Sequence, residues 1–193
     1  WELMTKNILL VGVGGQGTIL TSKILSRGFM EQGYDVKMSE IHGMNQRGGT
    51  VTTQIRFGEK VYSPVIETGT ADIIVAFEKS EALRYLHYLK KDGILVVNDY
   101  EIQPVTVAIG AETYPEGLLE SYKETVEKTY VIDAFHKAEA LGSTKAMNIV
   151  LLGALVRMLE LTDIDWKALL AEEVPPKAVE MNLKAFEAGF EVK

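Results

Sequence analysis

The feature that most constrains this chain is a glycine-rich turn between an apolar segment and a helical one. Residues 7–11 form a short apolar run without alternation, which predicts a strand buried on both faces. Residues 18–32 carry apolar side chains at helical spacing, and Gly33 is expected to end that helix. Between them lies Gly12-Val13-Gly14-Gly15-Gln16-Gly17. A strand, such a turn and a helix in this order predict the first crossover of a Rossmann-like α/β domain.

Each glycine of this turn has an expected role. Gly12 permits the tight turn, Gly14 lets backbone approach a phosphate, and Gly17 allows the helix to pack closely on the strand. Gly15 and Gln16 complete the turn, and the helix that follows offers free N–H groups and a positive dipole end to an anion. Two interpretations stay open: a site for a phosphate-bearing ligand, and glycines that serve packing alone.

A second loop follows the next predicted strand. Residues 34–41 read as a strand, and Glu40 near its end has about the 20-residue spacing expected of a ribose ligand in a dinucleotide site. The polar, glycine-rich segment His42-Gly43-Met44-Asn45-Gln46-Arg47-Gly48-Gly49 comes next. Loops at the carboxyl ends of parallel strands form the ligand crevice, so we expect the two glycine loops to be neighbours. His42 is then placed to donate a hydrogen bond to the same anion.

Three further side chains of this loop are candidate ligand groups. Arg47, flanked by glycine, can donate two parallel hydrogen bonds to a phosphate or carboxylate. Asn45 and Gln46 supply amide hydrogen bonds. The alternative is a structural turn in which Arg47 pairs with an acidic side chain, Glu40 or Glu78.

The rest of the chain continues the α/β alternation. Residues 50–57 alternate polar and apolar side chains, and Gly58-Glu59-Lys60 leads into residues 61–64, which predicts an inserted β-hairpin. Further strands are predicted at 72–77, 93–97, 105–109 and 130–132, and helices at 79–89, 115–128, 144–161 and after Pro175-Pro176. Ser143 or Thr144 is expected to cap the helix that ends at 161, which is apolar almost all round and therefore buried in the domain or against a partner. The fold class is α/β, a doubly wound and mostly parallel sheet with an inserted hairpin.

Composition excludes several functions. The 193 residues include no cysteine, so disulfides, a cysteine nucleophile and cysteine-ligated zinc or iron–sulfur clusters are not expected on this chain. A formal net charge of −7 opposes nucleic-acid binding. The chain has three histidines, few candidate ligands for a histidine metal site. No signal peptide or apolar run long enough to cross a bilayer is seen, so we expect a cytoplasmic protein. Residues 4–193 are expected to form one domain, and residues 1–3, which precede Met4, to be a remnant outside it.

The two loops together resemble the gamma-type domain of the 2-oxoacid:ferredoxin oxidoreductases. The resemblance rests on the residue 11–17 turn and on the segment 39–51, and it extends through Tyr62-Ser63-Pro64, residues 71–78, residues 148–155 and residues 182–189. The Glu-x-His-Gly-Met-x-Gln-Arg-Gly-Gly form of the second loop is most similar to the indolepyruvate branch of that family. The likeness covers nearly the whole chain.

This resemblance implies the small subunit of a heteromeric enzyme. Such an enzyme decarboxylates an arylpyruvate oxidatively, transfers the acyl group to coenzyme A and reduces ferredoxin. Thiamine diphosphate and the iron–sulfur clusters would lie on a large partner subunit, which agrees with the absence of cysteine. By the same resemblance the two loops would contact the phosphates of coenzyme A or position the partner's active site, and the chain alone would be inactive. Catalytic residues are not identified.

Two other functions fit the same residues. A free-standing nucleotide-binding regulatory module would need only the glycine turn and Glu40. A purely structural subunit would use the loops for packing alone.

Overall fold

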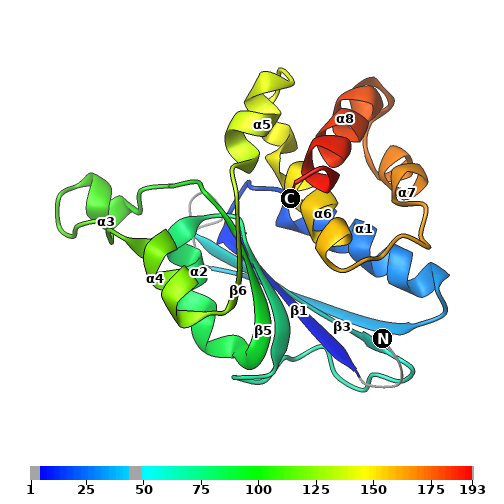
Figure 1. Ribbon diagram of the computed structural model, residues 1–193, viewed down its shortest axis with the longest axis horizontal. Helices are drawn as coiled ribbons and strands as arrows, with labels where there is room; N and C mark the ends of the chain where they lie inside the picture. The colour runs from blue at the N-terminus through cyan, green and yellow to red at the C-terminus, as the bar shows by residue number, and fades with distance from the viewer. Residues whose placement is uncertain (1–4, 44–48, 193) are drawn as a thin grey trace.

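The computed structural model describes residues 5–43 and 49–192, which fold around one six-stranded sheet (Figure 1). The strands are β1 (Lys6–Val13), β2 (Asp35–His42), β3 (Thr50–Gly58), β4 (Ala71–Ala76), β5 (Leu89–Asn98) and β6 (Lys128–Ile132). The longer helices are α1 (Thr18–Glu31), α4 (Leu118–Thr125), α6 (Met147–Met158), α7 (Trp166–Glu173) and α8 (Val179–Phe190). Shorter ones are α2 (Lys79–Tyr85), α3 (Val105–Ala108) and α5 (Ala134–Ala140). The predicted α/β alternation is confirmed.

The sheet has the order β2-β3-β1-β4-β5-β6, and β3 alone runs against the others. An ordinary dinucleotide-binding sheet places its second strand beside the first. Here β3 lies between β1 and β2 and pairs antiparallel with both. The predicted mostly parallel sheet with an inserted hairpin is therefore confirmed, and the hairpin occupies one edge of the sheet.

The strands of that hairpin differ from the prediction. Residues 50–57 were expected to pair with residues 61–64, which instead form no strand. Both edges of β3 are already occupied, by β1 on one side and β2 on the other, so no ladder is free for a later segment. The Val61 N–H donates instead to the Asp35 carboxylate at 3.0 Å.

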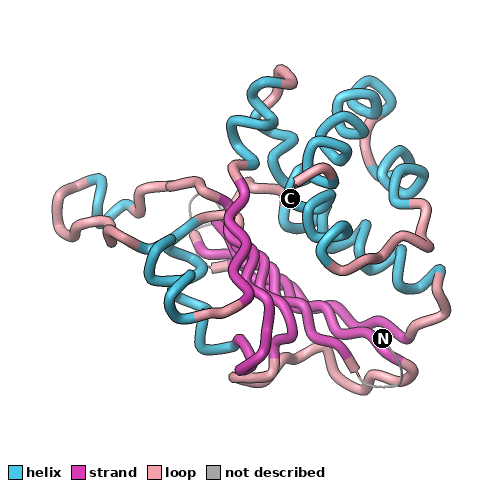
Figure 2. Tube along the Cα trace, in the orientation of Figure 1, coloured by secondary structure: helices cyan, strands magenta, loops and turns pink. Residues whose placement is uncertain are grey.

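Helices lie on both sides of the sheet (Figure 2). Alternating side chains of the strands pack into two separate hydrophobic cores. Ile8 and Leu10 face α1 and α6, whereas Leu9 and Val11 face α2 and α4. All four side chains are at most 1% exposed, as expected for a parallel strand covered by helices on both faces. The chain thus changes face between α1 and α2, which makes the carboxyl ends of β1 and β4 the switch point at which ligands of such sheets bind.

Helix α6 is the buried helix that the sequence predicted. Its residues 148–156 are all buried, within the domain, and α8 packs along it. The helix begins at Met147 after a short 3-10 turn over 144–146, and Ser143 before that turn makes no side-chain capping bond. Gly153 and Gly189 let α6 and α8 touch by their backbones. No helix of residues 5–43 and 49–192 has the length and hydropathy to span a bilayer.

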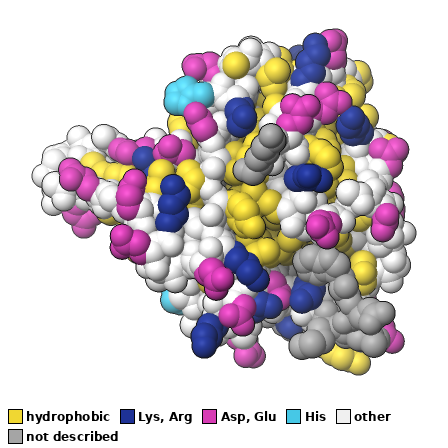
Figure 3. All heavy atoms as spheres, in the orientation of Figure 1, with side chains coloured by type: hydrophobic (Ala, Val, Ile, Leu, Met, Phe, Trp, Pro, Cys, Tyr) yellow, Lys and Arg dark blue, Asp and Glu magenta, His cyan; other side chains and the backbone are white. Residues whose placement is uncertain are grey.

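The strand predicted at residues 105–109 is wrong. The segment forms the single turn α3 on an arm that projects from the sheet at the left of Figures 1 and 3. The Pro104 carbonyl accepts hydrogen bonds from the Val107 and Ala108 N–H groups, which closes a helical turn. The apolar side chains of this segment alternate as in a strand, but the arm has no neighbouring strand with which it could pair. Val105 and Ile109 are accordingly 65% and 72% exposed.

The close α6–α8 contact predicts that one added methyl group at this interface lowers the stability of the fold strongly. A Cβ at position 189 would lie 1.9 Å from the Val150 carbonyl oxygen, and one at position 153 would lie 2.1 Å from that of Phe186. Because backbone cannot rotate away as a side chain does, Gly189→Ala is expected to lower the free energy of unfolding by at least about 2 kcal/mol in urea titrations. Glu180→Ala on the exposed side of α8 is the control. Equal, small effects of both substitutions would contradict this packing.

Candidate functional site

The glycine turn lies at the carboxyl end of β1, and two of its glycines allow close packing. A Cβ on Gly12 would lie 2.8 Å from the Gln16 Oε1 atom and 3.0 Å from the Phe77 Cβ atom. Gly17 has a φ of +80°, and a Cβ there would meet the Asn148 side chain at 2.4 Å. Gly17 therefore packs against α6, a helix, whereas the sequence pattern suggested helix-on-strand packing.

The Gln16 side chain holds this turn together. It is 5% exposed, its Oε1 accepts a hydrogen bond from the Val13 N–H at 2.7 Å, and its Nε2 donates to the Phe77 carbonyl at 2.9 Å. The amide thus joins the ends of β1 and β4. Both of its polar atoms are used inside the protein, so the structure gives Gln16 a supporting position behind the loop.

The described ends of the second loop lie next to the glycine turn, in agreement with the predicted proximity of the two loops. The Gly14 N–H donates to the Gly49 carbonyl at 3.0 Å, where β1 ends beside the start of β3. This bond also removes the Gly14 N–H from the groups that can bind a ligand. The predicted phosphate contact at Gly14 is therefore limited to close approach of its backbone.

Free N–H groups remain on the other side of the turn. The first hydrogen bond of α1 joins the Thr21 N–H to the Gly17 carbonyl at 3.2 Å. Within the described residues, the N–H groups of Gly15, Gly17 and Thr18 have no acceptor, and no side chain caps α1. A cavity of about 450 Å³ opens over these groups, and Gly14, Ile19, His42 and Val51 complete its lining. These N–H groups lie at the positive end of a 14-residue helix, which makes them candidate ligands of an anion.

Register across the hairpin brings His42 to this cavity. His42 lies opposite Val51 of β3, and Val51 lies opposite Gly12 of β1. The His42 side chain is 41% exposed, and its Nε2 lies 3.5 Å from the Glu40 Oε2. An imidazole that is exposed to the cavity and close to a carboxylate can donate to a bound anion.

Glu40 lies one strand farther from β1 than the acidic residue of an ordinary dinucleotide-binding sheet. In such a sheet the acidic residue ends the strand next to β1. Here β3 lies between β1 and β2, which adds about 4.8 Å, and Glu40 of β2 lies opposite Thr53 of β3. A ligand contact by Glu40 stays a prediction.

The remaining residues of the second loop fall outside the structure described. Asn45, Gln46 and Arg47 are candidates from the sequence alone, and the pairing of Arg47 with Glu40 or Glu78 stays a prediction. Glu78 itself is fully buried and has donors of its own. Its carboxylate accepts from the Glu81 N–H at 3.0 Å, which caps α2, and from the Tyr114 hydroxyl. Burial and the Glu78 carboxylate raise the pKa of Tyr114 above its usual range.

Two asparagines behind the site have roles that the sequence reasoning missed. Asn148 Nδ2 donates to the Gly17 carbonyl at 3.2 Å, which ties α6 to the turn. Asn98 is fully buried, and its amide joins the Phe77 carbonyl at 3.1 Å to the Ala134 N–H at 3.1 Å. Each asparagine lies in an otherwise apolar segment of the sequence. Because a buried amide needs hydrogen-bond partners, a single asparagine in such a segment is the signal that could have indicated these roles.

No three His, Asp or Glu side chains of the described residues are grouped as a metal site. His87 and His136 are exposed and lie away from the cavity lining. His136 Nδ1 lies 2.8 Å from the Asp133 carboxylate, which caps α5.

Comparison with known proteins places this chain among oxidoreductase subunits. Residues 7–192 match the family model "Pyruvate ferredoxin/flavodoxin oxidoreductase". The chain is 41% identical over 190 residues to the indolepyruvate oxidoreductase subunit IorB of Pyrococcus horikoshii, a match that covers 95% of this chain and 93% of that protein.

Two solved structures share the fold. The gamma subunit of a keto/oxoacid ferredoxin oxidoreductase from Geobacter sulfurreducens superposes with a TM-score of 0.70 at 24% identity, over 96% of both chains. The 2-oxoglutarate:ferredoxin oxidoreductase of Magnetococcus marinus, solved with 2-oxoglutarate, coenzyme A and succinyl-CoA bound, gives a TM-score of 0.75 at 23% identity. That match covers 98% of this chain and 31% of the longer one.

The Gln16 contacts predict a specific loss of stability. Gln16→Leu keeps a similar volume but leaves the buried Val13 N–H and Phe77 carbonyl without this partner, so we expect the free energy of unfolding to fall by about 2–3 kcal/mol. Gln32→Leu is the matched control, because the exposed Gln32 amide makes one bond of 3.3 Å to the Asp163 carbonyl. Chemical denaturation of both variants tests the point. If Gln16→Leu is as stable as the control, the amide does not hold the turn.

Proposed function

The chain belongs to the pyruvate ferredoxin/flavodoxin oxidoreductase family, and from this premise we propose that it is the small subunit of an indolepyruvate:ferredoxin oxidoreductase. The reaction takes an arylpyruvate and coenzyme A, releases carbon dioxide, forms the acyl thioester and passes the electrons to ferredoxin. Support for this substrate class comes from 41% identity to an indolepyruvate oxidoreductase subunit along almost the whole length of both chains.

In this proposal the redox groups belong to a large partner subunit. This chain has no cysteine to ligate an iron–sulfur cluster, and its described residues offer no metal-ligand group. Thiamine diphosphate on the partner supplies the decarboxylation chemistry, and ferredoxin meets the partner's clusters. The contribution of the small subunit is to bind and position.

The observation that carries the proposed role is the set of free N–H groups at Gly15, Gly17 and Thr18. Coenzyme A is rich in phosphate, and a chain with a net charge of −7 needs a locally positive site to hold it. The start of α1 provides that site, with His42 at its side and Arg47 as a further candidate from the same loop. We infer that these groups hold a phosphate of coenzyme A and thereby direct its thiol toward the partner's active site.

The subunit assignment predicts that activity depends on assembly. Co-expression with the large subunit of the same enzyme is expected to give a complex that reduces ferredoxin with indolepyruvate and coenzyme A, whereas neither chain does so alone. Anaerobic assays with each reactant omitted in turn measure this. A stable monomer that never changes the large subunit's activity would overturn the proposal, and tight NAD binding by the isolated chain would favour a nucleotide-binding module instead.

The phosphate role predicts a selective kinetic defect. Gly15 has open space around its Cβ position, so the side chain of Gly15→Asp meets no neighbouring atom and places a negative charge among the free N–H groups. Its φ of +96° adds backbone strain, which the control below must share. We expect the KM for coenzyme A in the assembled enzyme to rise by at least about tenfold, with the KM for the oxoacid unchanged.

Gly33 is the matched control for this substitution. It has a φ of +84° and equally open space, and it lies at the opposite end of α1. Gly33→Asp should share the backbone strain and leave the coenzyme A kinetics unchanged. Equal KM values in the two variants would refute the phosphate site while leaving the subunit assignment in place.

A further inference from the structure

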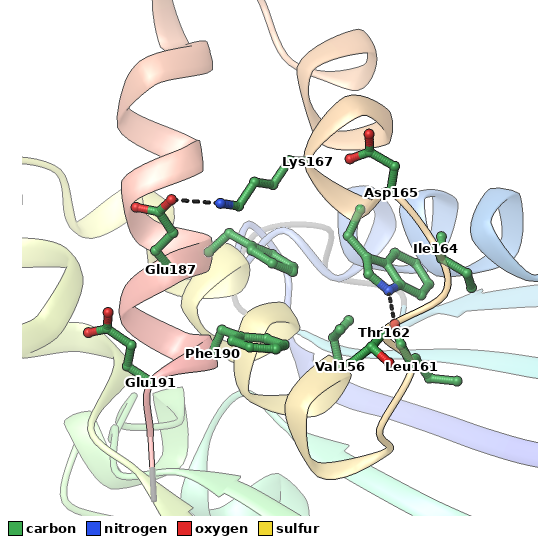
Figure 4. Close-up of a pocket in the computed structure, with 11 residues that line it drawn as sticks. Val156, Leu161, Thr162, Ile164, Asp165, Lys167, Glu187, Phe190 and Glu191 are labelled. Atoms are coloured by element: carbon green, nitrogen blue, oxygen red, sulfur yellow. Dashed lines mark hydrogen bonds and ion pairs between the residues drawn. The ribbon is translucent and has the colours of Figure 1, made fainter.

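A second cavity lies between α6, α7 and α8, away from the glycine loop (Figure 4). Its volume of about 420 Å³ falls within the range of small-molecule sites. Helix α6 runs from one site to the other and so gives the distance between them. Asn148 near its start contacts Gly17, and Val156 near its end lines this cavity. Eight residues of helix separate them by about 12 Å along the axis. The cavity is therefore distinct from the proposed coenzyme A site.

The interior of the cavity is apolar and aromatic. Trp166 of α7 and Phe186 of α8 are each 4% exposed, and Phe190 follows one turn after Phe186. The Trp166 indole N–H already donates to the Leu161 carbonyl at 2.7 Å, so the ring does not need a hydrogen-bond acceptor from a bound molecule. Such walls favour a flat aromatic group, which can stack or make edge contacts.

The rim of the cavity carries charges of both signs. Lys167 of α7 and Glu187 of α8 form an ion pair of 2.7 Å across it (Figure 4). Their side chains are 53% and 54% exposed, and an ion pair in solvent is weak enough to be replaced by groups of a ligand. Glu191 also lines the rim and pairs with no basic side chain in the part of the chain that the structure describes. The Arg157 guanidinium lies over the Phe190 ring, 5.6 Å from its centre, and Arg157 is not part of the cavity lining.

An occupant that satisfies all of these groups has a ring, a cation and an anion. We propose that this cavity binds a free aromatic α-amino acid. Its ring lies among Trp166, Phe186 and Phe190, its ammonium group meets Glu187 and Glu191, and its carboxylate meets Lys167. A simple apolar molecule leaves the rim unused, and a purely cationic or anionic one uses only half of it. The proposal does not depend on the coenzyme A site.

The test is an NMR titration of the full chain with L-phenylalanine. The sequence has two tryptophans, so Trp166→Phe assigns the Trp166 indole N–H signal. We expect that signal to shift saturably with a dissociation constant of about 1 mM or below. Phenylethylamine and 3-phenylpropionate, which each lack one charge, should bind at least about threefold more weakly, and L-alanine should cause no shift.

Rim variants locate the binding. Glu187→Gln is expected to weaken L-phenylalanine at least about threefold without weakening 3-phenylpropionate, and Lys167→Gln to do so without weakening phenylethylamine. The matched controls are Glu180→Gln and Lys184→Gln, which break an exposed ion pair of 2.7 Å on α8 that lies outside the cavity. Absence of a saturable shift, equal binding of the three ring compounds, or rim variants that behave like the controls would each overturn the proposal.

Discussion

A single buried amide holds the turn on which the candidate site depends. Gln16 joins the Val13 N–H to the Phe77 carbonyl, so the ends of β1 and β4 are fixed relative to each other at the switch point of the sheet. The Gly14–Gly49 bond attaches the second loop to the same point. With those groups engaged, the N–H groups of Gly15, Gly17 and Thr18 have no acceptor among residues 5–43 and 49–192, and these three residues line the cavity. We propose an anion site here because the protein satisfies one side of the turn and leaves these groups of the other side available.

The antiparallel strand β3 distinguishes this sheet from that of an ordinary dinucleotide-binding protein. It occupies the place beside β1 where the ribose-binding strand would lie, and it moves Glu40 one strand away. In exchange it delivers Gly49 to the turn and His42 to the cavity. The same insertion thus separates Glu40 from β1 and brings both described ends of the second loop to the turn where we propose that a phosphate binds.

Local patterns predicted much of this fold, and non-local pairing accounts for most of the errors. The strand at 7–11, the helix that Gly33 ends and the buried helix α6 follow from the spacing of apolar side chains within each segment. The partners of β3 and the helical turn at 105–109 depend on which neighbours are free, and that information is not in the segment itself. In the site, the motif located the turn, but which N–H groups remain free depends on Gln16 and Gly49. Asn45, Gln46 and Arg47 remain predictions.

We propose that the amides of Gly15, Gly17 and Thr18 hold a phosphate of coenzyme A. An NMR titration that follows the backbone amide signals of the isotopically labelled chain while coenzyme A is added tests this directly. We expect saturable shifts at Gly15, Gly17 and Thr18, and a much smaller shift at Gly14, whose N–H is already bonded to Gly49. Coenzyme A binding that leaves the three amides unmoved, or that moves Gly14 as far as they move, would contradict it.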